Sequence, residues 1–303
     1  MSRTLRRAVG AIVIAVLSIA PAVALPVAER VRFESLDRDH GQPVWIDGLL
    51  YRPHGAARSR PAVIALHGCG GLFQRGPRSA ALTQRHAMHA QALLDAGYVV
   101  LLPDSFGSRG VTEICTQRTR ERTIGPAKRR LDALGALRWL SAQPGVARER
   151  IALLGWSHGA STLLATIDTA DPQAGALGAA VDAPPFFRAA VAFYPGCAAS
   201  LRNDRWRPVV PTRILIGAAD DWTPAQPCVQ LAAKARERGW PIETTIYEGA
   251  HHGFDAPGDR VVHRTDVPNG VHAGHGVHVG PDPAARADAR RRVDAFLRET
   301  IGH

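Results

Sequence analysis

The sequence predicts an α/β fold, in which a mostly parallel sheet of eight strands is covered by helices on both faces. Short apolar runs bounded by turn residues alternate with longer segments whose apolar residues recur at helical spacing. The chain has 303 residues, of which 46% are hydrophobic and 21% charged, so it can enclose a large core and lacks the composition of a disordered protein. Because no internal repeat or low-complexity linker interrupts the alternation, we expect one domain over residues 25–303.

The apolar runs give the predicted strands, and the first two of them predict a hairpin at the start of the sheet. The eight strands are expected at residues 31–36, 44–51, 62–66, 98–103, 151–155, 189–194, 213–217 and 243–247. Helices are expected at residues 84–96, 126–141, 160–166 and 283–299. Gly, Pro and His are frequent over residues 255–282, where apolar periodicity disappears, so this segment is predicted to be a long loop.

The N-terminus has the layout of a secretory signal peptide. Three arginines precede an uncharged stretch over residues 8–28, and the small residues of Ala-Val-Ala at 22–24 fit cleavage after Ala24. An uncleaved membrane anchor is the alternative, but Pro21 and Pro26 interrupt the uncharged run. We therefore expect residues 1–24 to be a signal peptide, and the mature chain to be periplasmic or secreted with no stable membrane insertion.

The charge distribution does not favour a nucleic-acid partner. The net charge of +10 falls to about +7 when the three arginines of the signal are removed, and the other arginines are scattered among acidic residues. The densest basic cluster, Lys128, Arg129 and Arg130, lies on a predicted helix, and we expect it to be a solvated face.

Four cysteines in an exported protein favour disulfides, and none has the Cys-x-x-Cys spacing of a zinc or redox site. Three pairings are possible. Cys69 and Cys115 follow the third and fourth predicted strands, whereas Cys197 and Cys228 follow the sixth and seventh. This topology predicts the bonds Cys69–Cys115 and Cys197–Cys228.

A nucleophile elbow is the strongest signal for chemistry. Gly155-Trp156-Ser157-His158-Gly159 directly follows an apolar strand and precedes a helix, the context that a G-x-S-x-G motif requires. The two glycines relieve crowding in a tight turn that would expose the hydroxyl of Ser157 above the sheet edge. We therefore expect Ser157 to be a nucleophile.

A serine hydroxyl needs a base, and the base needs an acid to orient it. The segment after the seventh predicted strand carries Asp220 and Asp221, and the segment after the eighth carries His251 and His252. The order serine, acid, histidine is the one expected for this type of elbow. Either member of each pair could be a turn residue.

A tetrahedral intermediate also needs two backbone N–H donors for its oxyanion. The amide of His158, which follows the nucleophile, is one candidate. The loop His67-Gly68-Cys69-Gly70-Gly71 after the third predicted strand can supply the other, and we nominate the amide of Cys69. The side chain of His67 is expected to be structural, because this role uses the loop's amides.

These segments, with the sequence Pro-Asp-Ser-Phe-Gly-Ser-Arg-Gly at 103–110, resemble the dienelactone hydrolase family from about Val44 onward. The resemblance implies the α/β-hydrolase fold. Its Gly-x-x-Asp-x-x-x-Pro pattern places the catalytic acid on Asp220, and its Tyr-x-Gly-Ala-x-His-Gly-Phe pattern places the catalytic base on His252. The enzymes that give the family its name use cysteine in the elbow, so Ser157 indicates a general carboxylic-ester hydrolase.

The expected reaction is the hydrolysis of a small-molecule ester through an acyl-enzyme, with no metal and no cofactor. Phe106, Trp156 and Trp222 flank the predicted site and are candidates for lining its pocket. A metal site at His272, His275 and His278 is the less favoured interpretation of that histidine-rich loop, because the intervening glycines break any helical pattern.

Three alternatives stand beside this interpretation. A secreted polyester hydrolase would also combine an elbow with disulfides, and activity on an insoluble polymer would distinguish it. A peptidase of the prolyl-oligopeptidase type uses a similar elbow, but this chain has no room for the large extra domain of those enzymes. A non-catalytic binding module usually loses the nucleophile or the histidine, and this sequence retains both.

Overall fold

The computed structural model describes residues 25–55, 59–74, 80–170, 186–208 and 210–302. The predicted signal peptide at 1–24 lies outside these residues. Among the described residues, no helix is long and apolar enough to cross a membrane.

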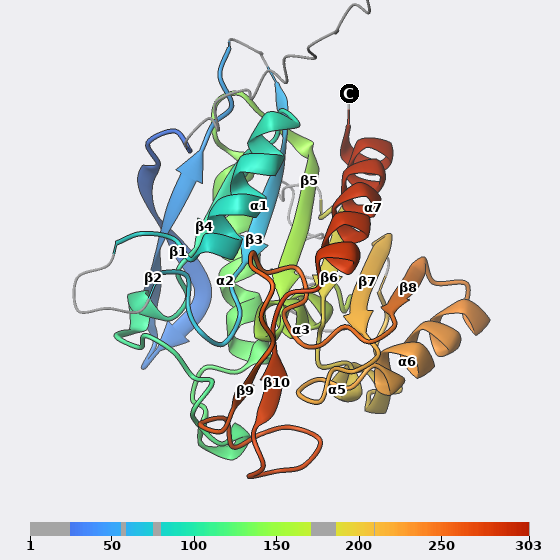
Figure 1. Cartoon of the computed structure of the whole chain (residues 1–303). Coiled ribbons are helices and arrows are strands. Elements are labelled where there is room, and N and C mark those ends of the chain that lie inside the picture. The colour runs from blue at the N-terminus through green and yellow to red at the C-terminus, as the bar shows by residue number, and fades with distance from the viewer. Residues whose placement is uncertain (1–24, 56–58, 75–79, 171–185, 209, 303) are drawn as a thin grey trace, which may run out of the picture.

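Eight strands form one sheet, as the sequence predicts (Figure 1). The order across the sheet is β1-β2-β4-β3-β5-β6-β7-β8. The strands β1 and β2 are antiparallel to each other, β2 is antiparallel to β4, and all later neighbours are parallel. Their bounds are Glu29–Asp39, Gln42–Tyr51, Arg60–Leu66, Val99–Pro103, Val146–Trp156, Ala189–Phe193, Thr212–Gly217 and Ile242–Tyr247, for β1 to β8 in chain order.

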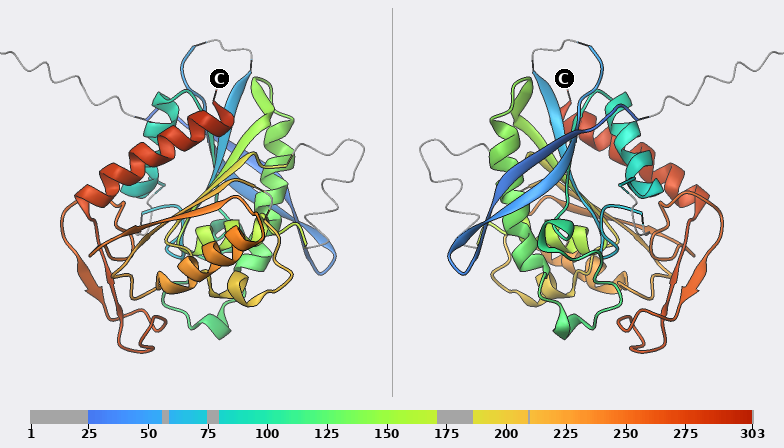
Figure 2. Two further views of the ribbon diagram at one scale, coloured as in Figure 1. Left: turned by 90° about the vertical axis from the view of Figure 1, so that its right-hand side faces the viewer. Right: turned by 90° about the vertical axis from the view of Figure 1, so that its left-hand side faces the viewer.

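Helices cover both faces of the sheet (Figures 1 and 2). The helices α1 (Gln84–Asp95) and α7 (Pro283–Ile301) lie on one face, and α2 (Pro126–Ser141), α3 (His158–Thr166) and α6 (Gln226–Glu237) lie on the other. Short helical segments complete the loops: α5 (Ala198–Arg202), η1 (Gly107–Arg109) and η2 (Thr119–Glu121). The fold is therefore the predicted three-layer α/β arrangement.

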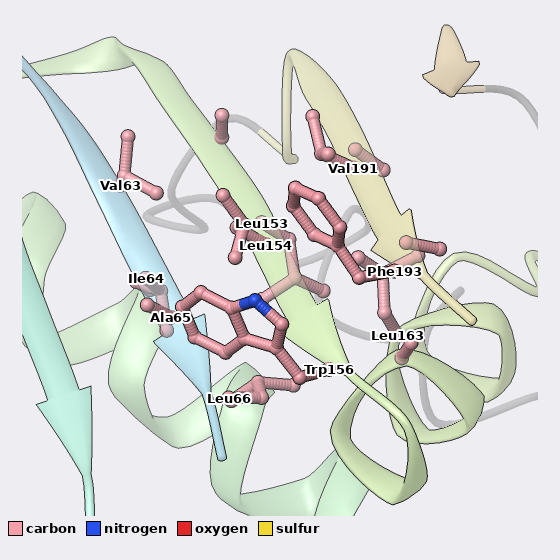
Figure 3. Close-up of a cluster of buried hydrophobic side chains, with 14 of the residues drawn as sticks. Val63, Ile64, Ala65, Leu66, Leu153, Leu154, Trp156, Leu163, Val191 and Phe193 are labelled. Atoms are coloured by element: carbon pink, nitrogen blue, oxygen red, sulfur yellow. The ribbon is translucent and has the colours of Figure 1, made fainter. Parts of the chain in front are cut away.

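The central parallel strands are buried on both faces because helices pack against each side. In β3, β4 and β6 nearly every residue is buried, which explains their continuous apolar sequence. Figure 3 shows the middle of this core, where side chains of β3, β5 and β6 pack with Leu163 of α3. This core fixes the carboxyl end of β5, from which the elbow begins.

The segment 255–282 is not a structureless loop, which corrects the prediction. It contains a short antiparallel hairpin, β9 (Val262–Arg264) and β10 (Val277–Val279), in which His263 pairs with His278. The hairpin lies beyond the carboxyl ends of the parallel strands (Figure 1), and Gly280 N–H donates to the carbonyl of His252. Two three-residue strands are too short to give a recognisable alternation in the sequence.

The expectation of a solvated basic face at residues 128–130 is wrong for two of its three residues. Lys128 is exposed, but Arg129 is 1% exposed and Arg130 is 7% exposed. The helix α2 packs against both β1 and α3, so that ten of its sixteen residues are buried and little of its surface is left for water. The exposure of a helical arginine depends on these neighbours and not on the local sequence.

The helix α6 was not predicted, because its apolar stripe is weak in sequence. The buried residues are Cys228, Leu231, Ala232 and Ala235, and two of them are alanines. The first of the four forms a disulfide with Cys197. The other disulfide joins Cys69 to Cys115, so both predicted bonds are confirmed.

Candidate active site

Ser157 sits on a strained turn between β5 and α3. Its φ of 52° and ψ of −115° lie in a region that L-residues rarely adopt. A side chain at Gly159 would approach the carbonyl oxygen of Leu66 to 2.1 Å, and one at Gly155 would approach the carbonyl oxygen of Gly159 to 2.5 Å. Both glycines are therefore required by close backbone contact, as the elbow motif predicts.

Ser157, His252 and Asp220 form a continuous chain of hydrogen bonds. The distance from Ser157 Oγ to His252 Nε2 is 2.9 Å, and that from His252 Nδ1 to Asp220 Oδ2 is 2.8 Å. The carboxylate of Asp220 can only accept, so Nδ1 carries the proton and Nε2 is free to accept from the hydroxyl of Ser157. Asp220 is buried, and its Oδ1 also accepts from the amides of Trp222 and Thr223.

The neighbouring Asp221 and His251 point elsewhere. Asp221 accepts from Nδ1 of His278 at 2.7 Å and from the backbone amide of the same residue at 2.8 Å. Burial raises the pKa of Asp221, but the hydrogen bonds from His278 outweigh burial and hold this pKa below its usual value. The ring of His251 bonds to the carbonyl of Ala219. Asp221 therefore anchors the β9–β10 hairpin, and the arrangement at Ser157 uses Asp220 and His252.

Thr223 is a polar neighbour of this chain that the sequence interpretation missed. Its hydroxyl lies 3.1 Å from Asp220 Oδ2 and 3.1 Å from His252 Nδ1, and it donates to the carbonyl of Tyr194 at 3.0 Å. The ring of Tyr194 packs against that of His252, with centroids 4.6 Å apart. Thr223 is one of the unspecified positions of the Gly-x-x-Asp-x-x-x-Pro pattern, and this pattern is the sequence feature that could have indicated its place beside Asp220.

One nominated oxyanion donor belongs to the elbow itself, and the other belongs to a loop that lies against it. The amide of His158 opens α3, so it has no partner within the helix. Gly68 allows the loop after β3 to approach, since a side chain there would lie 3.3 Å from the carbonyl oxygen of Trp156. The amide of Cys69 makes no hydrogen bond within the described part of the chain, while its carbonyl accepts from Ile114. Neither amide has a hydrogen-bond acceptor among the described residues, as an oxyanion donor would require.

A buried group of basic side chains lies behind this loop. His67 donates through Nδ1 to the carbonyl of Gly68, and Nδ1 of His158 accepts from Nη1 of Arg129 at 2.9 Å. Burial, together with the charge of Arg129, holds the pKa of both imidazoles well below the usual value, so both are neutral at pH 7. The side chain of His67 therefore hydrogen bonds to the backbone of its own loop, which is the structural role expected for it.

Of the three aromatic residues expected to line a pocket, Trp222 is the one beside His252. It is partly exposed, and its ring centroid lies 4.7 Å from that of His252. Phe106 is fully buried between His67 and Arg129. Trp156 is 1% exposed and lies among the core side chains of Figure 3, on the face of the sheet that α1 covers. The structure therefore does not bring Phe106 or Trp156 to an open surface.

Asp255 is a second residue near the site that the sequence interpretation missed. This fully buried carboxylate accepts from the indole of Trp156 at 2.8 Å, the hydroxyl of Tyr194 at 2.6 Å and Nε2 of His89 at 2.8 Å, and it pairs with Arg85 at 3.2 Å. It thereby joins the residue before Ser157, the ring against His252 and the helix α1. Burial raises the pKa of Asp255, but Arg85 and the hydrogen bonds outweigh burial and hold this pKa below its usual value.

Asn269 connects two loops near the site. Its amide side chain accepts from the backbone and hydroxyl of Thr119 and donates to the carbonyl of Gln117. The loop after β9 thus meets the segment that the Cys69–Cys115 bond holds. Within the described ranges, no group of three or more histidine, cysteine or acidic residues could hold a metal ion.

Comparisons with known proteins agree with this architecture. A sequence model described as the dienelactone hydrolase family matches residues 46–301. No curated protein matches the chain in sequence. Among solved structures, a Klebsiella pneumoniae protein described as a dienelactone hydrolase is 16% identical, with a TM-score of 0.60 over 89% of this chain and 99% of that one.

Two further structures share the fold. The thermophilic esterase Est2 of Thermogutta terrifontis is 20% identical, with a TM-score of 0.61 over 90% of this chain and 92% of that one. Dipeptidyl peptidase 4 of Porphyromonas gingivalis is 15% identical, with a TM-score of 0.59 over 92% of this chain. Only 36% of that peptidase chain is covered, so it is much longer than the chain described above.

Proposed function

Because the chain belongs to the dienelactone hydrolase family, we propose that it hydrolyses carboxylic esters through an acyl-enzyme on Ser157. The family makes the chain a hydrolase of ester bonds. The finer proposal rests on one observation, the unbroken chain of hydrogen bonds from Ser157 through His252 to Asp220, on a strained elbow. Serine in place of the family's cysteine favours ordinary carboxylic esters as substrates.

In the proposed mechanism, His252 Nε2 takes the proton of Ser157 as its Oγ attacks the ester carbonyl carbon. The carbonyl oxygen becomes an oxyanion, which accepts from the amides of His158 and Cys69. The intermediate then expels the alcohol, which receives the proton from His252, and leaves the acyl group on Ser157. A water molecule then attacks the acyl-enzyme in the same way, with His252 as its base, and the carboxylic acid is released as Ser157 regains its proton. Asp220 holds the imidazole and stabilises its charged form.

Two further proposals concern the location of the protein and the size of its substrate. The cleavage motif at residues 22–24 and the two disulfides support export to the periplasm or secretion. The substrate is proposed to be a small-molecule ester that passes Trp222, the partly exposed aromatic residue beside His252.

The test is turnover of p-nitrophenyl esters from acetate to octanoate by the mature chain, together with labelling by a fluorophosphonate. Thermogutta terrifontis esterase 2 is phosphorylated by paraoxon, which motivates a phosphorus probe. We expect turnover and labelling in the wild type, and neither in a folded Ser157→Ala variant. Turnover that survives Ser157→Ala, or a folded wild type that shows neither turnover nor labelling, would contradict the proposal.

The Cys69–Cys115 bond is expected to support activity more than the Cys197–Cys228 bond does. Replacing either pair by alanine should lower the free energy of unfolding by about 2–4 kcal/mol, because the bonds close loops of 46 and 31 residues. Loss of the first bond also frees the loop that carries the Cys69 amide, so kcat should fall about 10- to 100-fold. Urea unfolding and ester kinetics on both double variants check this, and equal kcat values in the two would contradict it.

A further inference from the structure

Arg129 is a buried cation whose guanidinium makes no hydrogen bond to a carboxylate among the described residues. It lies in the first turn of α2 and is 1% exposed. Its Nη1 donates to Nδ1 of His158, whereas its Nε and Nη2 have no hydrogen-bond partner within the described ranges. Burial of a charge without compensation is strongly unfavourable. Such an arrangement in a folded protein points to a functional reason for keeping it.

A nearby arginine shows the ordinary way of burying this group. Arg109 donates to both carboxylate oxygens of Asp132 and also to Asp37. Asp132 lies on the same helix as Arg129, and its oxygens are occupied by Arg109 and by the hydroxyl of Ser35. Asp132 therefore hydrogen bonds to other groups and acts on Arg129 only at longer range.

The groups in direct contact with Arg129 carry no negative charge, and the carboxylates of Asp132 and Asp104 act on it only at longer range. The guanidinium carbon lies 4.8 Å from the ring centroid of Phe106, and the other contact is the neutral imidazole of His158. Burial lowers the pKa of Arg129 to about 10, which still leaves the side chain protonated at neutral pH. A full positive charge is thus fixed against the side chain of the residue that follows Ser157.

We propose that Arg129 is a positioning residue that orients His158, the first residue of α3, and supports the oxyanion bound at its amide. This rests on the function proposed above. By donating to Nδ1, Arg129 fixes one orientation and one tautomer of the ring, and so restrains the peptide that carries the oxyanion-binding N–H. Its charge acts when negative charge develops on the substrate oxygen, so it stabilises the transition state more than the bound ester.

The test compares Arg129→Met, Arg129→Gln and the control Lys128→Met in the mature chain. Lys128 is the exposed neighbour on the same helix, so its variant makes the same change in charge. Kinetics on p-nitrophenyl butyrate, inhibition by a trifluoromethyl ketone and thermal unfolding are measured. For Arg129→Met we expect kcat to fall about 10- to 100-fold with KM within about threefold. The affinity for the ketone, whose serine adduct carries an oxyanion, should fall by the same factor as kcat/KM.

Stability separates this role from a structural one. Because Arg129→Met removes a buried charge that has no directly bonded carboxylate, its unfolding midpoint should equal or exceed that of the wild type. Lys128→Met should keep wild-type kinetics. Arg129→Gln keeps a donor for His158 but loses the charge, so an intermediate loss of kcat is expected, and this variant decides the matter if the methionine variant does not fold.

Wild-type kcat and ketone affinity in either folded Arg129 variant would overturn the proposal, as would a loss of kcat matched by an equal rise in KM. Failure of the proposed function is a different result. There, the wild type itself would lack turnover that depends on Ser157.

Discussion

Replacing His252 with glutamine is expected to lower kcat for ester hydrolysis by about 10⁴- to 10⁶-fold, with little change in KM. Within the described residues, the imidazole is the one hydrogen-bond partner of the Ser157 hydroxyl, at 2.9 Å. Glutamine can still hydrogen bond but cannot take a proton, so the nucleophile stays unactivated. Asp220→Asn should lower kcat about 10⁴-fold, because the amide favours the wrong tautomer of His252.

The chain supplies a matched control for each of these variants in the adjacent residue. His251→Gln and Asp221→Asn make the same chemical changes, but these side chains face the carbonyl of Ala219 and the hairpin residue His278. We expect both control variants to keep kcat within roughly tenfold of the wild type, since neither touches the reacting atoms. Equal losses in His251→Gln and His252→Gln, measured on folded proteins with the same ester, would mean that the base is wrongly assigned.

The parts of this site that the sequence predicts are those fixed by short-range backbone constraints. The elbow requires Gly155 and Gly159 because neighbouring backbone passes where a side chain would lie. The disulfide pairing follows from strand order, because parallel strands bring their carboxyl ends to one edge. The choice of Asp220 over Asp221 rests on the family resemblance, and in the structure the Asp220 carboxylate accepts from two backbone amides and from His252.

The parts that could not be predicted depend on distant packing. Trp156 adjoins Ser157 in sequence, but successive side chains of a strand point to opposite faces, and this one enters the core on the side of α1. Arg129 and Arg130 are buried by elements that lie far away in the sequence. The three hydrogen-bond partners of Asp255 are 61, 99 and 166 residues away, so nothing in the local sequence marks this aspartate as part of the site.

Asp255→Ala is expected to lower the free energy of unfolding by about 3–5 kcal/mol, the largest stability effect of the variants considered. The substitution leaves the cation of Arg85, the buried donors of Trp156 and Tyr194 and the partly buried donor of His89 without their acceptor. The fold shields these donors from water, so a donor that loses the carboxylate does not regain an equivalent hydrogen bond to water. Chemical unfolding measures the change, with Asp95→Ala as a control that removes an exposed aspartate from the end of α1.

The pH dependence of stability gives a second readout of the same residue. The folded-state pKa of Asp255 lies below that of an unfolded aspartate, which is about 3.9. The folded state therefore keeps Asp255 ionised to a lower pH than the unfolded state does. The ionised carboxylate stabilises the fold fully above the pKa of the unfolded aspartate, and this stabilisation is lost as the pH falls through the folded-state pKa. The wild type should lose stability below about pH 4, and Asp255→Asn should flatten this part of the curve. Parallel acid-unfolding curves for the two proteins would contradict the assignment.

Asp255 also connects stability to the proposed chemistry. It holds the indole next to Ser157 and the phenol whose ring packs on His252, so the proposed nucleophile and the proposed base share one buried anchor. A double-mutant cycle with Tyr194→Phe separates these roles. If the anchor aligns the site, Asp255→Asn and Tyr194→Phe will each lower kcat in the folded protein, and the double variant will lose less than the product of the two. Independent, multiplicative losses would instead mean that the carboxylate stabilises the fold without aligning His252.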